Sequence, residues 1–264
     1  MKSFFDVESY AFGSVLIVLF VLISVGGVFV IRKHPFVERL RPYHDVSGNI
    51  FSVAGTLYAV LLGLVVVDAM QTFQTARLTV EHESEALTNL YMMANRLPQE
   101  KADPIKTLCA AYAEAVAQQE WPLMAEGRIH ETSRSLARDL LKAIASIDPD
   151  SDNLRAVYPI MLEQSVELRN QRRMRTSLAT YDLPTVEWIV LCTGAVITVF
   201  FTYLFRLESL RVQVAMTGMI SLLIALNLYL VVLFARPFSG DLHIDPTPFV
   251  TDLQIFDWAK AQTP

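Results

Sequence analysis

The chain has 264 residues, of which 53% are hydrophobic and 19% are charged, and its formal net charge is −5. Soluble domains contain about 45–50% apolar and about 25% charged residues, so this composition excludes a purely soluble protein and, equally, a disordered one. The negative charge offers no basic field for nucleic acid, and the two cysteines lie in segments of different character, which indicates neither a disulfide framework nor a zinc cluster.

The first predicted element is a membrane-spanning helix. It runs from Tyr10 to Ile31 without a charged residue and is followed by Arg32 and Lys33. About 20 apolar residues are enough to cross the hydrocarbon core. The run is longer than the apolar core of a signal peptide, and no small-residue cleavage site follows it, so we expect the span to be retained.

Three further segments have the length and apolarity of spans, at about 50–70, 188–205 and 212–234. None has a charge near its middle, where one would cost about 2.5–3.5 kcal/mol. None is interrupted by proline, so we predict helices rather than barrel strands. The predicted class is therefore all-α, with transmembrane helices 1 and 2 in residues 1–70 and transmembrane helices 3 and 4 in residues 183–236.

Four spans place both chain ends and the long middle segment on one side of the membrane. We expect that side to be the cytoplasm. The Lys and Arg residues that flank the spans are almost equally numerous on the two sides, so charge alone does not fix the orientation. Residues 237–264 form the C-terminal tail.

Residues 71–182 are predicted to be a helical soluble domain inserted between the second and third spans. The second span continues without a helix breaker as far as Pro98, which predicts one helix of about 45–48 residues projecting roughly 40 Å beyond the bilayer. The other helices expected here run from Asp103 to about Met124, from near Thr132 to Asp148, and from Ser151 or Asp152 to about Ala179.

Charged residues on the two helices that enter and leave this domain fall at comparable heights. At about 1.5 Å per residue, the acidic group of Glu81, Glu83 and Glu85 and the basic group from Arg169 to Arg175 both lie roughly 12–25 Å above the span ends. We therefore predict ion pairing between these helices, within one chain or between chains; the alternative, two independently solvated faces, remains open. The residues concerned are Asp68, Glu81, Glu85, Arg172, Arg173 and Arg175.

No pattern of catalytic or metal-binding residues stands out. Glu81, His82 and Glu83 are consecutive, so they lie on different faces of a helix and cannot form a metal site alone. The sequence contains no phosphate-binding glycine loop, nucleophile elbow or HExxH motif. We therefore predict that the protein is not an enzyme and needs no metal or cofactor.

The second span has one flank of small and weakly polar residues, when it is projected at 100° per residue. Such a flank lets helices pack closely, or, in several copies, it lines a pore that an apolar collar gates by dewetting. Spacing alone favours packing over a pore. Arg77 continues this flank at the inner mouth, and Asp68 lies on the opposite face. The candidate pore-lining residues are Ser52, Thr56, Ala59, Gly63, Val66, Val67 and Met70.

At these residues the chain resembles the bestrophin-like domain family, a group of four-span membrane proteins of unsettled function. The motifs that carry the resemblance keep their order over about residues 48–248. They are Gly55-Thr56-Leu57-Tyr58-Ala59-Val60-Leu61-Leu62-Gly63, Val65-Val66-Val67-Asp68, Glu85-Ala86-Leu87, Arg172-Arg173-Met174-Arg175, Leu183-Pro184, Trp188, Gly194, Pro237-Phe238-Ser239-Gly240 and Ile244-Asp245-Pro246.

The resemblance implies a homo-oligomeric channel, possibly a pentamer, whose pore is lined by the second span and which conducts a small anion. Bestrophins narrow the pore with bulky Ile and Phe rings, whereas this flank offers smaller residues, and no acidic calcium-binding cluster follows the fourth span. Calcium gating is therefore not expected. The partners expected are the lipid bilayer of the cell membrane, further copies of the chain and a permeant anion, but no nucleic acid. The alternative function is a non-conducting, membrane-anchored helical scaffold or sensor module.

Overall fold

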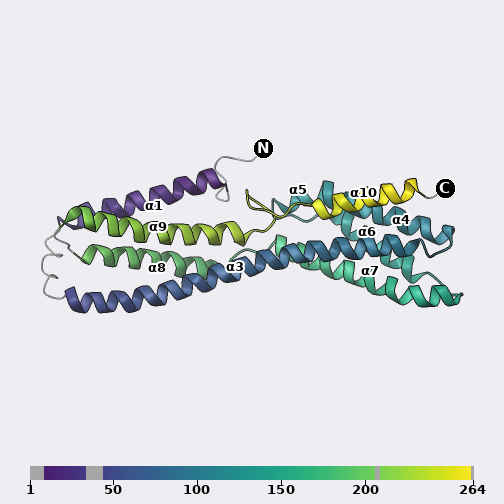
Figure 1. Cartoon of the computed structure of the whole chain (residues 1–264), viewed down its shortest axis with the longest axis horizontal. Coiled ribbons are helices and arrows are strands. Elements are labelled where there is room, and N and C mark those ends of the chain that lie inside the picture. The colour runs from purple at the N-terminus through teal and green to yellow at the C-terminus, as the bar shows by residue number, and fades with distance from the viewer. Residues whose placement is uncertain (1–8, 34–43, 206–208, 263–264) are drawn as a thin grey trace. The chain divides into compact units, whose positions relative to one another are not determined.

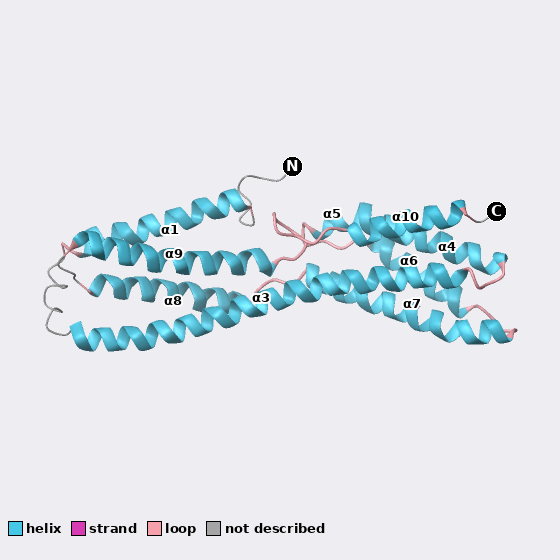
Figure 2. Ribbon diagram, viewed as in Figure 1, coloured by secondary structure: helices cyan, strands magenta, loops and turns pink. Residues whose placement is uncertain are grey.

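The computed structural model describes residues 9–33, 44–205 and 209–262, and side chains in the second range from residue 48. Within these ranges every regular element is helical, as Figure 2 shows. Four helices are long and apolar enough to cross a membrane. The predicted all-α class with four spans is confirmed. The chain divides into two units, each described by itself: residues 1–72, 182–235 and 240–242 form the first, and the remaining residues form the second.

The first unit contains the four candidate spans (Figure 1). They are α1 (Tyr10–Ile31), the first part of α3 (His44–Ala94), α8 (Thr185–Leu204) and α9 (Leu210–Ala235). Helix α9 packs against both α1 and α8. The predicted spans match these helices to within a few residues, apart from the start of α3, because a charge-free apolar run of about 20 residues has few other stable folds.

Tyrosine rings that pack against glycines connect the helices of the first unit. The hydroxyl of Tyr203 donates to the carbonyl of Ser24 at 2.8 Å, and a Cβ added to Gly27 would overlap the Tyr203 ring. Tyr58 makes the same kind of contact, because it lies against Gly194 and donates to the Leu191 carbonyl at 3.0 Å. Each contact combines a close approach to the backbone with a half-buried hydroxyl whose hydrogen bond is satisfied.

A third such contact joins α1 and α9. The ring of Tyr229 lies where a Cβ on Gly13 would stand, and its hydroxyl donates to the Ser9 carbonyl at 3.1 Å. The tyrosine rings therefore occupy the space that these glycines leave free, and a side chain at any of the glycines would separate two spans.

The second unit is a helical bundle around one apolar core. It contains the remainder of α3, α4 (Gln99–Glu114), the π-helix η2 (Ala115–Glu120), α5 (Trp121–Met124), α6 (Glu131–Ala145), α7 (Asp152–Ala179) and α10 (Thr247–Ala261). The side chain of Ser151 accepts a hydrogen bond from the Leu154 amide at 3.3 Å, which is the predicted N-cap of α7.

Two helix boundaries differ from the sequence prediction. Helix α4 begins at Gln99, directly after Pro98, and not at the Asp103-Pro104 pair. Pro104 lies inside the helix, where it forfeits a single backbone hydrogen bond. The expected continuous helix to Met124 is interrupted by η2, because Pro122 lacks an N–H group and its ring crowds the carbonyl one turn earlier.

The C-terminal tail contains a helix that the sequence analysis did not predict. Helix α10 packs against α4 and η2. Its Asp252 is buried and accepts hydrogen bonds from the hydroxyls of Ser84 and Thr88, both at 2.7 Å. Burial raises the pKa of Asp252, and the two hydroxyl donors partly offset this shift. Helix α10 therefore belongs to the core of the second unit.

Helix α10 also offers a test of this core. Phe249 is fully buried and its ring lies 6.0 Å from that of Trp121. We predict that Phe249→Ala lowers the free energy of unfolding by about 3–5 kcal/mol, because truncating a buried phenylalanine leaves a cavity. The measurement is thermal unfolding in detergent followed by circular dichroism. The control is Trp258→Ala on the same helix, where the side chain is 63% exposed and the expected change is below about 0.5 kcal/mol. Equal midpoints for the two variants would contradict the packing described.

Candidate functional site

One face of α3 packs against its own chain within the first unit. Leu62 and Ala69 are buried there, and Val65 and Val66 pack against a small cluster of Leu183, Val231 and Ala235. Val65, Val66 and Ala69 follow Leu62 by three, four and seven residues, so these side chains form one continuous stripe on the helix. The faces of α3 that remain are open to whatever lies outside a single chain.

The predicted pore-lining flank lies next to this packed face, about 90° around the helix at 100° per residue. Six of the seven predicted residues are exposed in the single chain, and Val66, at the border, is half-buried. Apart from the neighbouring backbone of α3 itself, no atom of the described residues lies within 4 Å of a Cβ added to Gly55 or Gly63. The small flank is therefore not used for close packing inside the chain. It is free to face lipid, another copy or a lumen.

The opposite flank is bulky and apolar. Leu57 and Leu64 are 68% and 66% exposed. Asp68 lies on this side and is also exposed, and among the described residues no ion pair to it is found. The two flanks of α3 thus differ in side-chain volume. A helix with this asymmetry can turn its small side toward a narrow axis and its bulky side toward lipid or a neighbouring helix.

Arg77 continues the small flank into the second unit. Its Nε lies 3.1 Å from Oε1 of Glu81, four residues further along α3, and both side chains are about half exposed. Pairs of this kind stabilise a helix by only about 0.3–0.5 kcal/mol. The positive charge of Arg77 is therefore offset by Glu81 while the carboxylate is present.

A buried cluster of charges lies in the core of the second unit. The Arg175 guanidinium is fully buried and donates to both carboxylate oxygens of Glu83, at 2.7 Å and 2.9 Å. It also donates to Glu120 at 3.0 Å, and Arg172 donates to the other oxygen of Glu120 at 2.6 Å. Two carboxylates and two guanidinium groups balance, so the cluster has no net charge.

Further contacts surround the cluster, although the buried Nε of Arg172 has no hydrogen-bond partner among the described residues. The hydroxyl of Tyr112 donates to Glu83 at 2.6 Å, and Arg175 stacks near the ring of Trp121 at 5.4 Å. Burial disfavours the charged form of Arg175, but the two carboxylates outweigh this and raise its pKa, so the guanidinium stays protonated. Burial and the neighbouring Glu83 raise the pKa of Tyr112, which therefore remains a donor.

Within one chain, the ion pair between α3 and α7 joins Arg175 to Glu83, the middle member of the acidic group expected to pair. Glu81, Glu85 and Arg173 are exposed, so pairing of these residues between chains stays a prediction. Height along a helix does not choose the face, and Glu83 shares the face of the buried Val80 and Leu87. A carboxylate within that apolar stripe was the available signal, since a buried charge requires a partner.

Glu120 was missed for another reason. It is the last residue of η2, and a π-turn rotates the following side chains relative to an α-helix. Periodicity at 3.6 residues per turn therefore misplaces it. Among the described residues no group of three or more His, Cys, Asp and Glu is placed to hold a metal ion.

Comparison with known proteins adds a family and a fold. The family described as "Bestrophin-like domain" matches residues 18–249. No curated protein matches the chain in sequence.

Solved structures have the same fold. A bacterial bestrophin homologue from Klebsiella pneumoniae gives a TM-score of 0.70 at 17% identity, with 94% of this chain and 100% of that chain covered. A singly substituted form of that homologue gives 0.68 at 16% identity, covering 91% and 98%. A structure described as a membrane protein gives 0.72 at 17% identity, covering 93% and 99%. At these identities the likeness shows the fold alone.

The buried cluster generates a prediction about stability. Arg175→Met removes one cation and leaves Glu83 and Glu120 short of partners, so we expect a loss of about 3–5 kcal/mol in the free energy of unfolding. The double variant Glu83→Gln/Arg175→Met should recover part of this loss, because one buried carboxylate is then neutral. The readout is the denaturant midpoint of the purified protein.

The matched control is Arg173→Met, on the same helix and exposed. It should change stability by less than about 0.5 kcal/mol. A similar loss for Arg173→Met and Arg175→Met would show that the cluster does not stabilise the unit.

Proposed function

The chain belongs to the Bestrophin-like domain family, as its motifs predict, and we propose that it forms a homo-oligomeric channel for small anions, with α3 lining the pore. The lining residues in this proposal are the small flank of α3, arranged around the axis of the oligomer. The second unit and the chain ends lie in the cytoplasm. The stoichiometry that the resemblance implies is five.

The observation that carries the proposal is the open small flank of α3. The chain packs its own helices against the neighbouring face of α3, around Leu62 and Ala69, and leaves Ala59 and Gly63 uncovered. A flank of small residues leaves room along an axis shared by several copies, whereas the bulky flank, with Leu57 and Leu64, suits lipid or an adjacent subunit.

The narrowest part of the proposed pore is apolar. Val67 and Met70 are 50% and 42% exposed and follow each other closely along the flank. A ring of such side chains around a narrow axis expels water, and a dewetted constriction blocks ions until it widens. Val66 is a poorer probe of this collar, because part of its surface packs against Leu183, Val231 and Ala235.

The same flank supports one other function, a non-conducting scaffold in which the small residues pack copies of α3 against each other. The uncovered Gly55 and Gly63 favour either arrangement, since both leave the glycines free within a single chain. The two functions differ in whether water reaches Ala59 to Met70 in the oligomer.

The first test of conduction uses the apolar collar. We expect purified protein to conduct chloride in planar bilayers and Val67→Ala/Met70→Ala to raise the single-channel conductance severalfold, because a wider and less apolar ring is wetted more easily. The matched control is Leu57→Ala/Leu64→Ala, which removes similar volume from the opposite flank and should leave conductance unchanged. Silent bilayers from a folded oligomer would reject the channel and leave the scaffold.

The second test concerns Arg77. Glu81→Gln leaves the positive charge of Arg77 without its carboxylate and should raise chloride current, whereas Arg77→Gln should lower it. Both effects should be largest near 10 mM salt and vanish near 1 M, where the Debye length falls from about 30 Å to about 3 Å. Current ratios that do not depend on salt would show that Arg77 does not act by concentrating anions.

A further inference from the structure

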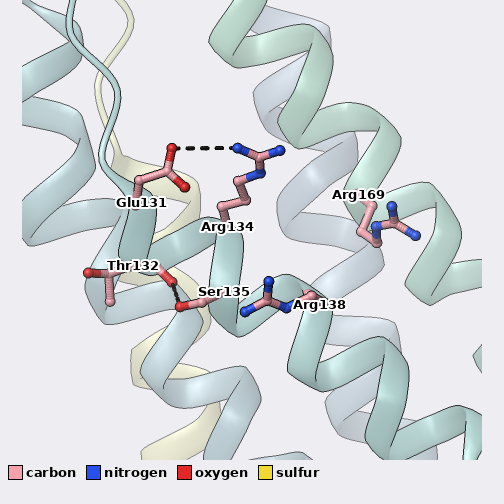
Figure 3. A pocket seen from close by; sticks show the side chains of 6 residues that line it. All are labelled: Glu131, Thr132, Arg134, Ser135, Arg138 and Arg169. Atoms are coloured by element: carbon pink, nitrogen blue, oxygen red, sulfur yellow. Dashed lines mark hydrogen bonds and ion pairs between the residues drawn. The ribbon is translucent and has the colours of Figure 1, made fainter.

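An open, arginine-lined pocket lies between α6 and α7 in the second unit. Its volume is about 660 Å³. Figure 3 shows that most of its lining comes from one face of α6, with Arg169 added from α7. The lining residues are Glu131, Thr132, Arg134, Ser135, Arg138 and Arg169. The lining contains three guanidinium groups and one carboxylate, so it carries a net positive charge.

The arginines of this pocket are only weakly engaged. Arg134 lies 3.5 Å from Glu131, and Arg138 lies 3.7 Å from Asp139. Asp139 is shared with Lys142, also at 3.7 Å. These are long, exposed pairs, in contrast to the contacts of 2.6–3.0 Å in the buried cluster. Within the part of the chain that the structure describes, most of the guanidinium N–H groups of Arg134 and Arg138 therefore have no acceptor at hydrogen-bonding distance, and Arg169 has no ion pair.

Hydrogen bonds from Arg172 fix the two helices that carry the pocket. Arg172 lies one turn further along α7 than Arg169 and is buried. Its Nη2 donates to the carbonyl of His130 at 3.2 Å, and His130 is the N-cap of α6. This bond attaches the start of α6 to α7 and to the buried cluster through Glu120. The arginines therefore project from two helices whose relative position is fixed by the hydrogen bonds of Arg172.

The start of α6 adds one further polar group. Thr132 brings a hydroxyl to the pocket, whereas the hydroxyl of Ser135 donates to the Thr132 carbonyl at 2.7 Å and is engaged within the helix. Guanidinium groups donate in planar pairs that match the oxygen atoms of phosphate groups. The pocket is much larger than a halide ion, and its volume falls within the range of sites for small organic ligands.

We propose that this pocket binds a small soluble anion that carries two or three linked phosphate groups. The phosphates lie across Arg134, Arg138 and Arg169, and Glu131 weakens the site by competing for Arg134. The site belongs to the second unit and is independent of the proposed conduction path. A ligand there would bridge α6 and α7 beside the buried cluster.

The test is isothermal titration calorimetry of the full-length protein in detergent with inorganic triphosphate. Arg134→Ala and Arg169→Ala should each raise Kd on the order of tenfold, because each removes a charge-assisted pair of hydrogen bonds. Glu131→Gln should lower Kd severalfold, because it frees Arg134 and removes the only negative charge of the lining. Circular dichroism spectra of the variants should match that of the unchanged protein.

Arg155→Ala is the matched control. Arg155 lies on α7 outside the pocket, is exposed and pairs with Asp152 at 3.5 Å, so its loss should change Kd by less than about twofold. A Kd that responds equally to Arg155→Ala and Arg169→Ala would mean non-specific attraction to positive charge and would overturn the proposal. So would the absence of saturable heat with triphosphate, including the case in which only vesicles containing phosphatidic acid bind the protein.

Discussion

Arg175 carries a full charge inside an apolar core, and the second unit is organised by the need to compensate it. Taking an ion out of water costs several kcal/mol even after relaxation, so the charge is tolerated only where carboxylates and further donors surround it. Glu83 from α3, Glu120 from η2 and Tyr112 from α4 all meet Arg175 or its partner. Three helices are therefore fixed in register with α7, since a shift of any of them by one residue would leave a charge unpaired.

The first unit has no buried charge to compensate among its described residues. Its surroundings are apolar, so an exposed leucine or valine there carries no free-energy cost. Specific association must then come from close packing and from polar groups that find partners. The chain uses the packed face of α3 and its tyrosine contacts for this purpose, and it leaves the small flank uncovered. The packed face of α3 thus serves contacts within the chain, whereas the small flank is left open to the surroundings of a single chain.

Composition and periodicity were enough to predict the four spans, the long second helix and most helices of the soluble segment, because apolar run length and N-caps such as Ser151 are local properties. They did not predict α10, whose role depends on hydrogen bonds that Asp252 accepts from residues more than 160 positions earlier in the chain. They also missed Glu83 and Glu120 as the buried carboxylates. Glu83 could have been found from its place in an apolar stripe, whereas the π-turn that sets Glu120 has no clear sequence signal.

The tyrosine–glycine contacts bear on how the spans associate during biogenesis. Each span can enter the bilayer as an independent helix, and association follows as a second step. At that step a tyrosine ring can settle only opposite a position without a side chain, and its hydroxyl must also reach a carbonyl near that position. Misaligned helices would meet neither condition, so these contacts select the native helix pairing from among many alternatives of equal hydrophobicity.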